Sequence, residues 1–158
     1  MMNIRLATLK DYLELANMKW EHCKEDDIDY NENNLIGVDK NQFIEKFIEF
    51  LKINTEYKIF IAEVNGVIAS SMFLYVIPKI PKPNGNSKSI AYLTNVYTKK
   101  EYRSKGIGKM LLNHIKEYLI KDKCELLFAW ASTNSLDWYC RNDFYNEKEL
   151  LQCDLMGE

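Results

Sequence analysis

The sequence predicts an α+β fold in which one mixed, mostly antiparallel sheet carries helices on both faces. Segments rich in β-branched and aromatic residues alternate with segments whose apolar residues recur every three or four positions. Strand-like runs follow one another without a helix over residues 58–98, whereas helical segments separate the other strands, and this mixed order is typical of α+β proteins. The 158 residues are 47% hydrophobic and 28% charged without a break in composition, so we expect a single domain over residues 1–158.

The first third of the chain predicts one short strand and two helices. We expect the strand at residues 3–6. Thr8 can cap a helix that continues to about Cys23, because the apolar residues there lie on one face at helical spacing. Residues 25–34 are polar, acidic and rich in asparagine, and they predict a mobile loop. A second helix is expected over residues 39–53, with an apolar stripe along one side.

The middle of the chain predicts an antiparallel meander of three strands. Residues 58–64 and 67–77 are β-branched and aromatic runs, and only Asn65 and Gly66 separate them. An Asn-Gly pair suits the positive φ angles of a two-residue type I′ turn, so the two runs are expected to form a hairpin. All three prolines fall within residues 78–88, which predicts a loop, and residues 89–98 are expected to form the third strand.

The last third predicts a long helix, a buried strand, a short helix and closing strands. Apolar residues lie on one face of a helix over residues 106–121. The run ELLFAWA at residues 125–131 is almost continuously apolar, as expected for a strand covered on both faces. Residues 132–135 offer capping side chains for a short helix that ends near Cys140, and residues 144–155 are expected to supply one or two closing strands.

Charge, cysteine and histidine content exclude several classes of function. Lysine and arginine number 21 against 23 aspartate and glutamate, a net charge of -2, and this balance argues against a protein that coats nucleic acid. No run approaches about 18 consecutive apolar residues, and the N-terminal residues lack the apolar core of a signal peptide, so we expect a cytoplasmic protein without a membrane partner. The cysteines form no CxxC pair and there are 2 histidines, so we expect no metal.

A glycine-containing loop, YRSKGIG, precedes the long helix and is the strongest functional signal. The N-terminus of a helix exposes unpaired N–H groups and the positive end of the helix dipole, which together favour anions. Gly106 and Gly108 remove Cβ atoms where a ligand would approach the backbone, and Arg103, Lys105 and Lys109 add positive charge. The loop therefore predicts a pyrophosphate site. The alternative is that both glycines only begin a helix and the lysines are solvated.

Two better-known phosphate motifs do not fit this loop. A P-loop requires GxxxxGK[ST], and that string is absent from the sequence. A dinucleotide fingerprint requires a third glycine where Leu111 stands, and it belongs near the first strand of a parallel βαβ unit.

The same residues resemble a family. The string RSKGIG at residues 103–108 is similar to the [RQ]-x-x-G-x-[GA] signature of the GNAT (Gcn5-related N-acetyltransferase) family, and YLTNVYT upstream resembles the strand that leads into it. Trp138-Tyr139 followed by Phe144 resembles the family string L-Y-x-x-x-G-F, which comes later in the same order. Asp143 replaces the usual glycine, and Asp tolerates the left-handed backbone better than most residues.

The resemblance implies a fold, a cosubstrate and a reaction. The fold is the GNAT-like acyl-CoA N-acyltransferase fold, with its sheet splayed between the fourth and fifth strands. The reaction is transfer of an acetyl group from acetyl-CoA to a primary amine by direct attack. Pantetheine would lie along the fourth strand against the backbone of Val96 and Thr98, and the pyrophosphate on the N–H groups of residues 103–108. The residues so implied for cofactor binding are Val96, Tyr97, Thr98, Arg103, Ser104, Lys105, Gly106, Ile107, Gly108, Lys109 and Asn134.

The resemblance also points to a catalytic acid. Tyr139 would protonate the departing CoA thiolate, since a phenol with a reference pKa of about 10 keeps its proton at neutral pH. The alternative is a tyrosine that only packs in the core. Asn134 resembles the polar residue that touches the CoA arm in relatives, and it would equally cap the short helix.

The acceptor side is less defined. Glu21 is one candidate general base, and the acidic residues 25–32 would attract a cationic amine, so the charge is divided between a cofactor side at residues 103–109 and an amine side. A nucleophilic pair of Cys140 and His22 is disfavoured because nothing in the sequence places the two together. The acceptor is expected to be a small-molecule or peptide amine, and the resemblance also allows a homodimer. Two alternatives stay open: a non-catalytic acyl-CoA-binding or sensor module on the same fold, and a phosphate-ligand enzyme of another fold.

Overall fold

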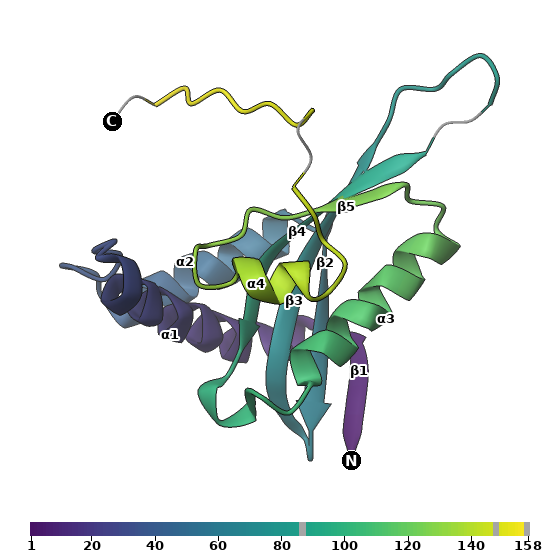
Figure 1. The fold of residues 1–158 in the computed structure, drawn as a ribbon. Helices are drawn as coiled ribbons and strands as arrows, with labels where there is room; N and C mark the ends of the chain where they lie inside the picture. Colours follow the sequence, from purple (N-terminus) through teal and green to yellow (C-terminus); the bar gives the residue numbers. More distant parts are fainter. Residues whose placement is uncertain (86–87, 147–148, 157–158) are drawn as a thin grey trace.

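The computed structural model describes residues 1–85, 88–146 and 149–156, and its centre is one five-stranded sheet (Figure 1). The strand order follows the chain, β1-β2-β3-β4-β5. Neighbours from β1 to β4 are antiparallel, while β5 is parallel to β4, so the expected mixed and mostly antiparallel sheet is confirmed. The strands are β1 (Met2–Leu6), β2 (Tyr57–Val64), β3 (Val67–Pro78), β4 (Ser89–Thr98) and β5 (Leu126–Phe128).

Helices cover both faces of the sheet, as predicted. The first pair, α1 (Tyr12–Tyr30) and α2 (Lys40–Ile53), packs on one face, and α3 (Ile107–Lys121) and α4 (Leu136–Cys140) lie on the other (Figure 1). Two 3-10 turns, η1 (Leu9–Asp11) and η2 (Lys100–Tyr102), precede α1 and α3. Among the helices in the described part of the chain, none combines the length and apolar character needed to cross a membrane.

Each face of the sheet has its own apolar core. On the α3 side, Leu111, Leu112 and Ile115 are fully buried against β2, β3 and β4. On the other side, Leu15 of α1 and Leu51 of α2 are each 1% exposed. Because side chains alternate along the strands, the sheet contributes apolar residues to two cores and lies between two helix layers.

The hairpin predicted from Asn65 and Gly66 is present between β2 and β3. The two turn residues have φ angles of 51° and 81°, as a type I′ turn requires. The helix predicted at residues 39–53 is also confirmed, because the Asp39 side chain accepts a hydrogen bond from the Gln42 amide at the start of α2.

The sheet splays between β4 and β5, and β4 carries a bulge. The two strands pair only at residues 90–92 with 126–128, after which β4 continues to Thr98 without β5. The register between β3 and β4 shifts after Thr94, and Asn95 adopts a left-handed backbone with φ 49°. A bulge of this kind adds a residue and bends the strand. The splay and the bulge lie together at the end of β4 that leads to the glycine loop.

The first helix is longer than the sequence predicted. Residues 25–30, expected in a mobile loop, complete α1, which ends at Tyr30 with Asn31 in the left-handed region. The expectation was wrong because the acidic side chains have folded partners. The Asp27 carboxylate accepts hydrogen bonds from the backbone amides of Asn34 and Leu35, and so fixes the chain after the helix.

The C-terminal expectations were wrong in two respects. The strand expected over residues 125–131 is only three residues long in the structure, as β5. It is not covered on both faces as expected: Leu126 is 48% exposed, because β5 is an edge strand with one neighbour. Residues 144–146 and 149–156 form no strand, and residues 147–148 lie outside the described part. Figure 1 shows the yellow C-terminal segment running away from the sheet. Its apolar residues give strand propensity but do not specify a partner strand.

Candidate functional site

A cavity of about 500 Å³ opens where β4 and β5 diverge. Its walls come from α1, from the end of β4, from the glycine loop before α3 and from the segment that enters α4. All the residues expected to bind the cofactor line it except Lys105. The splay of the sheet therefore brings together the strand and loop residues that the family resemblance implies for cofactor binding.

The glycine loop has the backbone geometry of an anion site. Ser104 and Gly106 adopt left-handed φ angles of 59° and 76°, and Gly106 is the N-cap of α3. The first-turn amides of this 15-residue helix have no partner within the helix, and the helix dipole adds positive potential there. A Cβ on Gly108 would lie 3.3 Å from Thr98 Oγ1 and 3.5 Å from Trp138 Cζ2. Gly108 thus allows close packing of protein groups, whereas Gly106 faces open space.

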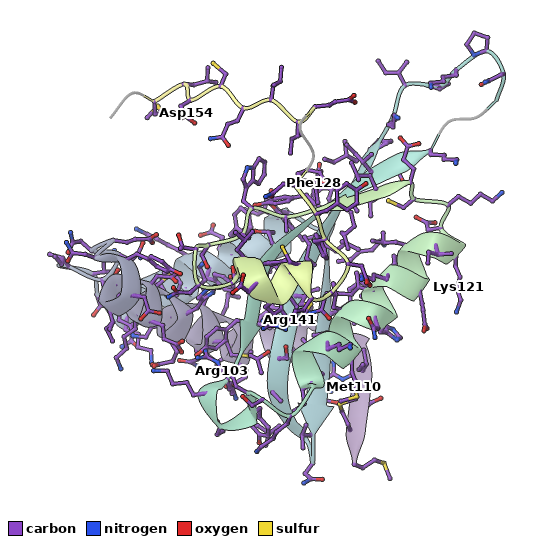
Figure 2. The ribbon with its side chains drawn as sticks, in the orientation of Figure 1. Arg103, Met110, Lys121, Phe128, Arg141 and Asp154 are labelled. Carbon is purple, nitrogen blue, oxygen red and sulfur yellow. The ribbon has the colours of Figure 1, made fainter. Side chains whose placement is uncertain are left out.

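The basic residues of the loop differ in their partners. The Arg103 guanidinium donates to the Thr98 carbonyl at 2.8 Å and to Glu25 at 2.7 Å. The Lys105 ammonium donates to the Glu101 carbonyl at 2.7 Å, outside the cavity. Figure 2 shows Arg103 on the loop before α3 and Arg141 at the end of α4, with Asp154 far from both. Lys109 lines the cavity, so it is the loop lysine positioned to meet an anion.

Glu25 joins α1 to β4 and to the glycine loop. Its carboxylate accepts from the Tyr97 hydroxyl at 2.7 Å as well as from Arg103. Burial pushes the pKa of Glu25 upward, but these two hydrogen bonds outweigh it, and the pKa is lowered overall. Burial and the Glu25 charge raise the pKa of Tyr97. No pattern in the sequence indicates this contact, because residues so far apart in the chain meet only through the fold.

Tyr139 lies on a second cavity of about 310 Å³ and does not line the first. Its ring is 7% exposed and packs edge-on against Trp138 and Phe144, so part of the packing alternative is also true. Burial, with a smaller contribution from Tyr92, raises the pKa of Tyr139 to about 12. The phenol therefore keeps its proton at neutral pH and can donate it.

The two cavities adjoin. Both are lined by His22 and Asp26 of α1, by Val96 of β4 and by Ser132 and Ser135. Val96 is next to the bulge residue, so β4 is a wall common to both. A group held along β4 in the first cavity thus reaches the boundary of the second.

Asn134 lies on the cofactor side of this boundary. Its backbone amide donates to the Tyr30 hydroxyl at 3.0 Å, which joins the end of α1 to the segment before α4. The N-cap of α4 is Ser135 and not Asn134. The capping alternative for Asn134 is therefore wrong, and Asn134 lines the first cavity, while its contact with the CoA arm stays a prediction.

Two further residues considered from the sequence, Glu21 and Cys140, lie outside both cavities. Glu21 lines neither of these cavities and lies 3.6 Å from Lys24 on the surface of α1. Cys140 is exposed and also lines neither, whereas His22 lines both, so no Cys140–His22 pair forms. Within residues 1–85, 88–146 and 149–156, no three His, Cys, Asp or Glu side chains gather as a metal site.

Asp143 takes the backbone conformation expected from its place in the motif. Its φ angle is 68°, and the Phe144 amide after it donates back to the Tyr139 carbonyl at 3.2 Å. This left-handed turn ends α4 and brings Phe144 against the ring of Tyr139. At the position where the resembled string L-Y-x-x-x-G-F has glycine, this chain therefore makes the left-handed turn with aspartate.

A comparison with protein families decides the identity of the fold. The sequence model of the acetyltransferase (GNAT) family matches residues 11–144, which is most of the 158 residues. The chain belongs to the GNAT family. The match covers the splayed strands, the glycine loop and Tyr139, so every part of the candidate site lies within the GNAT region.

Solved structures share the GNAT fold at low sequence identity. A predicted acetyltransferase from Clostridium acetobutylicum, solved with acetyl-CoA, is 22% identical with a TM-score of 0.72, over 98% of this chain and 97% of that one. A GCN5-related N-acetyltransferase from Ralstonia eutropha JMP134 is 18% identical with a TM-score of 0.72, over 98% and 99% of the chains. Glucosamine-6-phosphate N-acetyltransferase from Arabidopsis thaliana is 15% identical with a TM-score of 0.63, over 99% of both chains.

Proposed function

We propose that residues 1–158 form one N-acetyltransferase domain that transfers an acetyl group from acetyl-CoA to a primary amine in a ternary complex. The observation that carries the proposal is the pair of adjoining cavities at the splay of β4 and β5. One cavity has the glycine loop and the start of α3, and the other has a buried, protonated tyrosine. This is the arrangement that a transfer between two substrates requires.

The first cavity fits acetyl-CoA. The pyrophosphate would rest on the first-turn amides of α3 and the ammonium of Lys109. The pantetheine would follow β4 beyond the point where β5 leaves it, where the backbone of Val96 has no strand neighbour on that side. The Thr98 carbonyl already accepts from Arg103, so the backbone of Val96 would supply more of the pairing than Thr98. In the Clostridium acetobutylicum relative, acetyl-CoA is bound to the same fold.

Catalysis in this arrangement is mostly positioning and proton transfer. The acceptor nitrogen attacks the thioester carbonyl at the boundary of the two cavities. Tyr139 then donates its proton to the thiolate as the carbon–sulfur bond breaks. The raised pKa keeps this donor protonated, and the packing of its ring against Trp138 and Phe144 fixes its direction.

The test is a screen of amine acceptors with acetyl-CoA, read by release of free thiol. The panel comprises amino sugars, as the Arabidopsis thaliana relative's name suggests, together with aminoglycosides, polyamines and peptides with free N-termini. We expect release above the no-acceptor rate with at least one class, and a product heavier by one acetyl group in mass spectrometry. Binding of acetyl-CoA with no transfer to any class would instead favour the non-catalytic acyl-CoA-binding module.

A further inference from the structure

Two titratable side chains of α1 meet at the boundary of the two cavities. His22 and Asp26 are one helical turn apart, and the imidazole Nε2 lies 3.6 Å from the Asp26 Oδ2. Both residues line both cavities. Their side chains are 24% and 25% exposed, so each is partly removed from solvent but still reachable from the cavities.

The surroundings of His22 keep it neutral and in place. Its ring stacks on Tyr97, with centroids 5.1 Å apart, and its Nδ1 is buried without a hydrogen-bond partner. Burial lowers the pKa of His22, so the imidazole is uncharged at neutral pH. The other charged groups that act on it are Lys19 and Glu25 from α1 and Arg103 from the glycine loop.

Asp26 differs from Glu25 and Asp27, the two acids that flank it in α1, because its carboxylate is not engaged by hydrogen bonds. Glu25 is held by Tyr97 and Arg103, and Asp27 caps the chain after the helix. No hydrogen bond from any described residue reaches Asp26. Burial raises the pKa of Asp26, with further increases from Glu32 and Asp29, while His22 and Lys19 oppose the shift. Asp26 is thus a carboxylate with free acceptor capacity and greater basicity.

Resting on the proposed function, we infer that Asp26, with His22 beside it, is the proton acceptor for the amine substrate in the second cavity. The substrate class is a primary alkylammonium, which enters between Asp26 and Glu32 on one side and Tyr139 on the other. A carboxylate pairs with the ammonium form, takes one proton from it, and leaves the neutral nitrogen that attack requires. Glu21, the candidate from sequence, lies outside both cavities.

The protons and bonds of the transfer balance with this assignment. The ammonium gives one proton to Asp26, and its lone pair then forms the new C–N bond with the thioester carbon. The tetrahedral adduct loses a second proton from nitrogen as the C–S bond breaks. Tyr139 protonates the thiolate, and the second proton restores Tyr139. One proton passes from Asp26 to solvent, so the net products are the amide, CoA thiol and one proton.

The kinetic test compares Asp26→Asn with Glu21→Gln, a matched loss of one carboxylate from the same helix. With the best acceptor of the panel, kcat/KM of Asp26→Asn should fall about 100-fold or more at pH 7, the range for loss of a general base. The deficit should narrow as the pH approaches the pKa of the free amine, because the substrate then loses its proton unaided. Glu21→Gln should match the wild type in both kcat/KM and acetyl-CoA affinity, because Glu21 lines neither cavity. Rates are compared at saturating acetyl-CoA, since Asp26 also lines the first cavity. A deficit that is equal at every pH, or absent, overturns the inference.

His22→Gln separates proton sharing from simple packing. As the pH falls and His22 gains its proton, its positive charge lowers the pKa of Asp26, so its removal raises that pKa and moves the acid limb of kcat/KM against pH to higher pH. If His22 only packs against its neighbours, His22→Gln lowers kcat/KM without moving the acid limb of the pH profile. That result contradicts the pairing of His22 with Asp26.

A second readout does not depend on turnover. The chain has 2 histidines, so the imidazole NMR signals of His22 and His114 can be followed separately. Asp26→Asn should lower the pKa of His22 further, since the carboxylate raises it. The His114 signal comes from α3 and serves as the internal reference. Butylammonium should shift the His22 signal in the wild type but not in Asp26→Asn, and n-butanol should shift it in neither. An unshifted His22 overturns the inference, whereas a wild type without transfer activity contradicts only the proposed function.

Discussion

At the scale of single residues, Tyr139 is the side chain on which turnover depends most. Tyr139→Phe removes the hydroxyl and keeps the ring between Trp138 and Phe144. We expect kcat to fall about 100-fold or more, the range for loss of a general acid, with little change in acetyl-CoA affinity because Tyr139 does not line the first cavity. The control is Tyr118→Phe, which alters a tyrosine that packs on Phe60 away from both cavities. Equal rates for the two variants would contradict the role of Tyr139.

Asp143 tests whether backbone conformation, and not its charge, matters in the turn after α4. Its carboxylate is 90% exposed beside Lys116, so this ion pair contributes little. Its φ of 68° favours glycine, and we expect Asp143→Gly to keep or raise stability. Asp143→Ala should be less stable than Asp143→Gly by about 1 kcal/mol, because a Cβ is unfavourable in the left-handed region. Urea denaturation measures both, and equal stability would show that the turn relaxes.

Individual residues were predictable where a local rule applied. The glycine loop and the left-handed Asp143 follow from motif spacing and backbone preference, and the structure places them as expected. The sequence assigned residues 25–32 to the amine side as a group, but the different contacts of Glu25 and Asp26 were not predictable, because they need α1 to continue past Cys23 and to lie against β4. A sequence shows which side chains are acidic, but not which carboxylates will accept hydrogen bonds from a tyrosine or arginine far away in the chain.

At the scale of elements, the junction of β1, η1 and β2 depends on one arginine. Arg5 makes two hydrogen bonds to Asp11, at 2.8 and 2.9 Å, and two to Glu63, at 2.7 and 3.2 Å. The hydrogen bonds from Arg5 lower the pKa of Asp11 to about 2, against the effect of burial. The start of α1 is therefore tied to the sheet by a charged pair that is 33% and 10% exposed.

This junction gives stability a defined pH dependence. A carboxylate whose folded pKa is lowered stabilises the fold above its unfolded pKa, and the contribution disappears as pH falls through the folded value. Asp11→Asn should therefore lower the free energy of unfolding by about 2 kcal/mol at pH 7, and the difference should vanish between about pH 4 and pH 2. Denaturation at several pH values measures this, with the exposed Glu49→Gln as control. A difference that persists undiminished at pH 2 would contradict the pair.

Elements were predictable where their pattern was local. The hairpin of β2 and β3, the strand β4 and the helices α2 and α3 follow from turn chemistry and periodicity, and all are present. The end of α1 and the C-terminal strands were wrong, because both depend on partners distant in sequence. An acidic helix end persists where Arg103 and backbone amides meet it, and an apolar segment becomes a strand only where another strand accepts it.

At the scale of the whole molecule, the acidic and basic segments do not form two separate sides. The ion pair of Arg103 and Glu25 joins the two segments directly, and both residues line the first cavity. In the proposed function, the splay of the sheet separates the cofactor from the acceptor, since the glycine loop lines one cavity and Tyr139 lines the other. The net charge of -2 therefore describes a chain in which one acidic and one basic residue of the two segments, Glu25 and Arg103, pair with each other.

Calorimetric titration of acetyl-CoA into the wild type, Gly106→Ala and Gly66→Ala tests the central claim most directly. Both glycines have positive φ with open space around them, but only Gly106 lies at the cavity, so backbone strain is matched between the variants. We expect micromolar binding by the wild type and Gly66→Ala, and an affinity at least about 10-fold weaker for Gly106→Ala, because relief of the strained φ turns the loop amides away from the phosphates. No heat with the wild type, or equal affinity for all three chains, would contradict a cofactor site at the glycine loop.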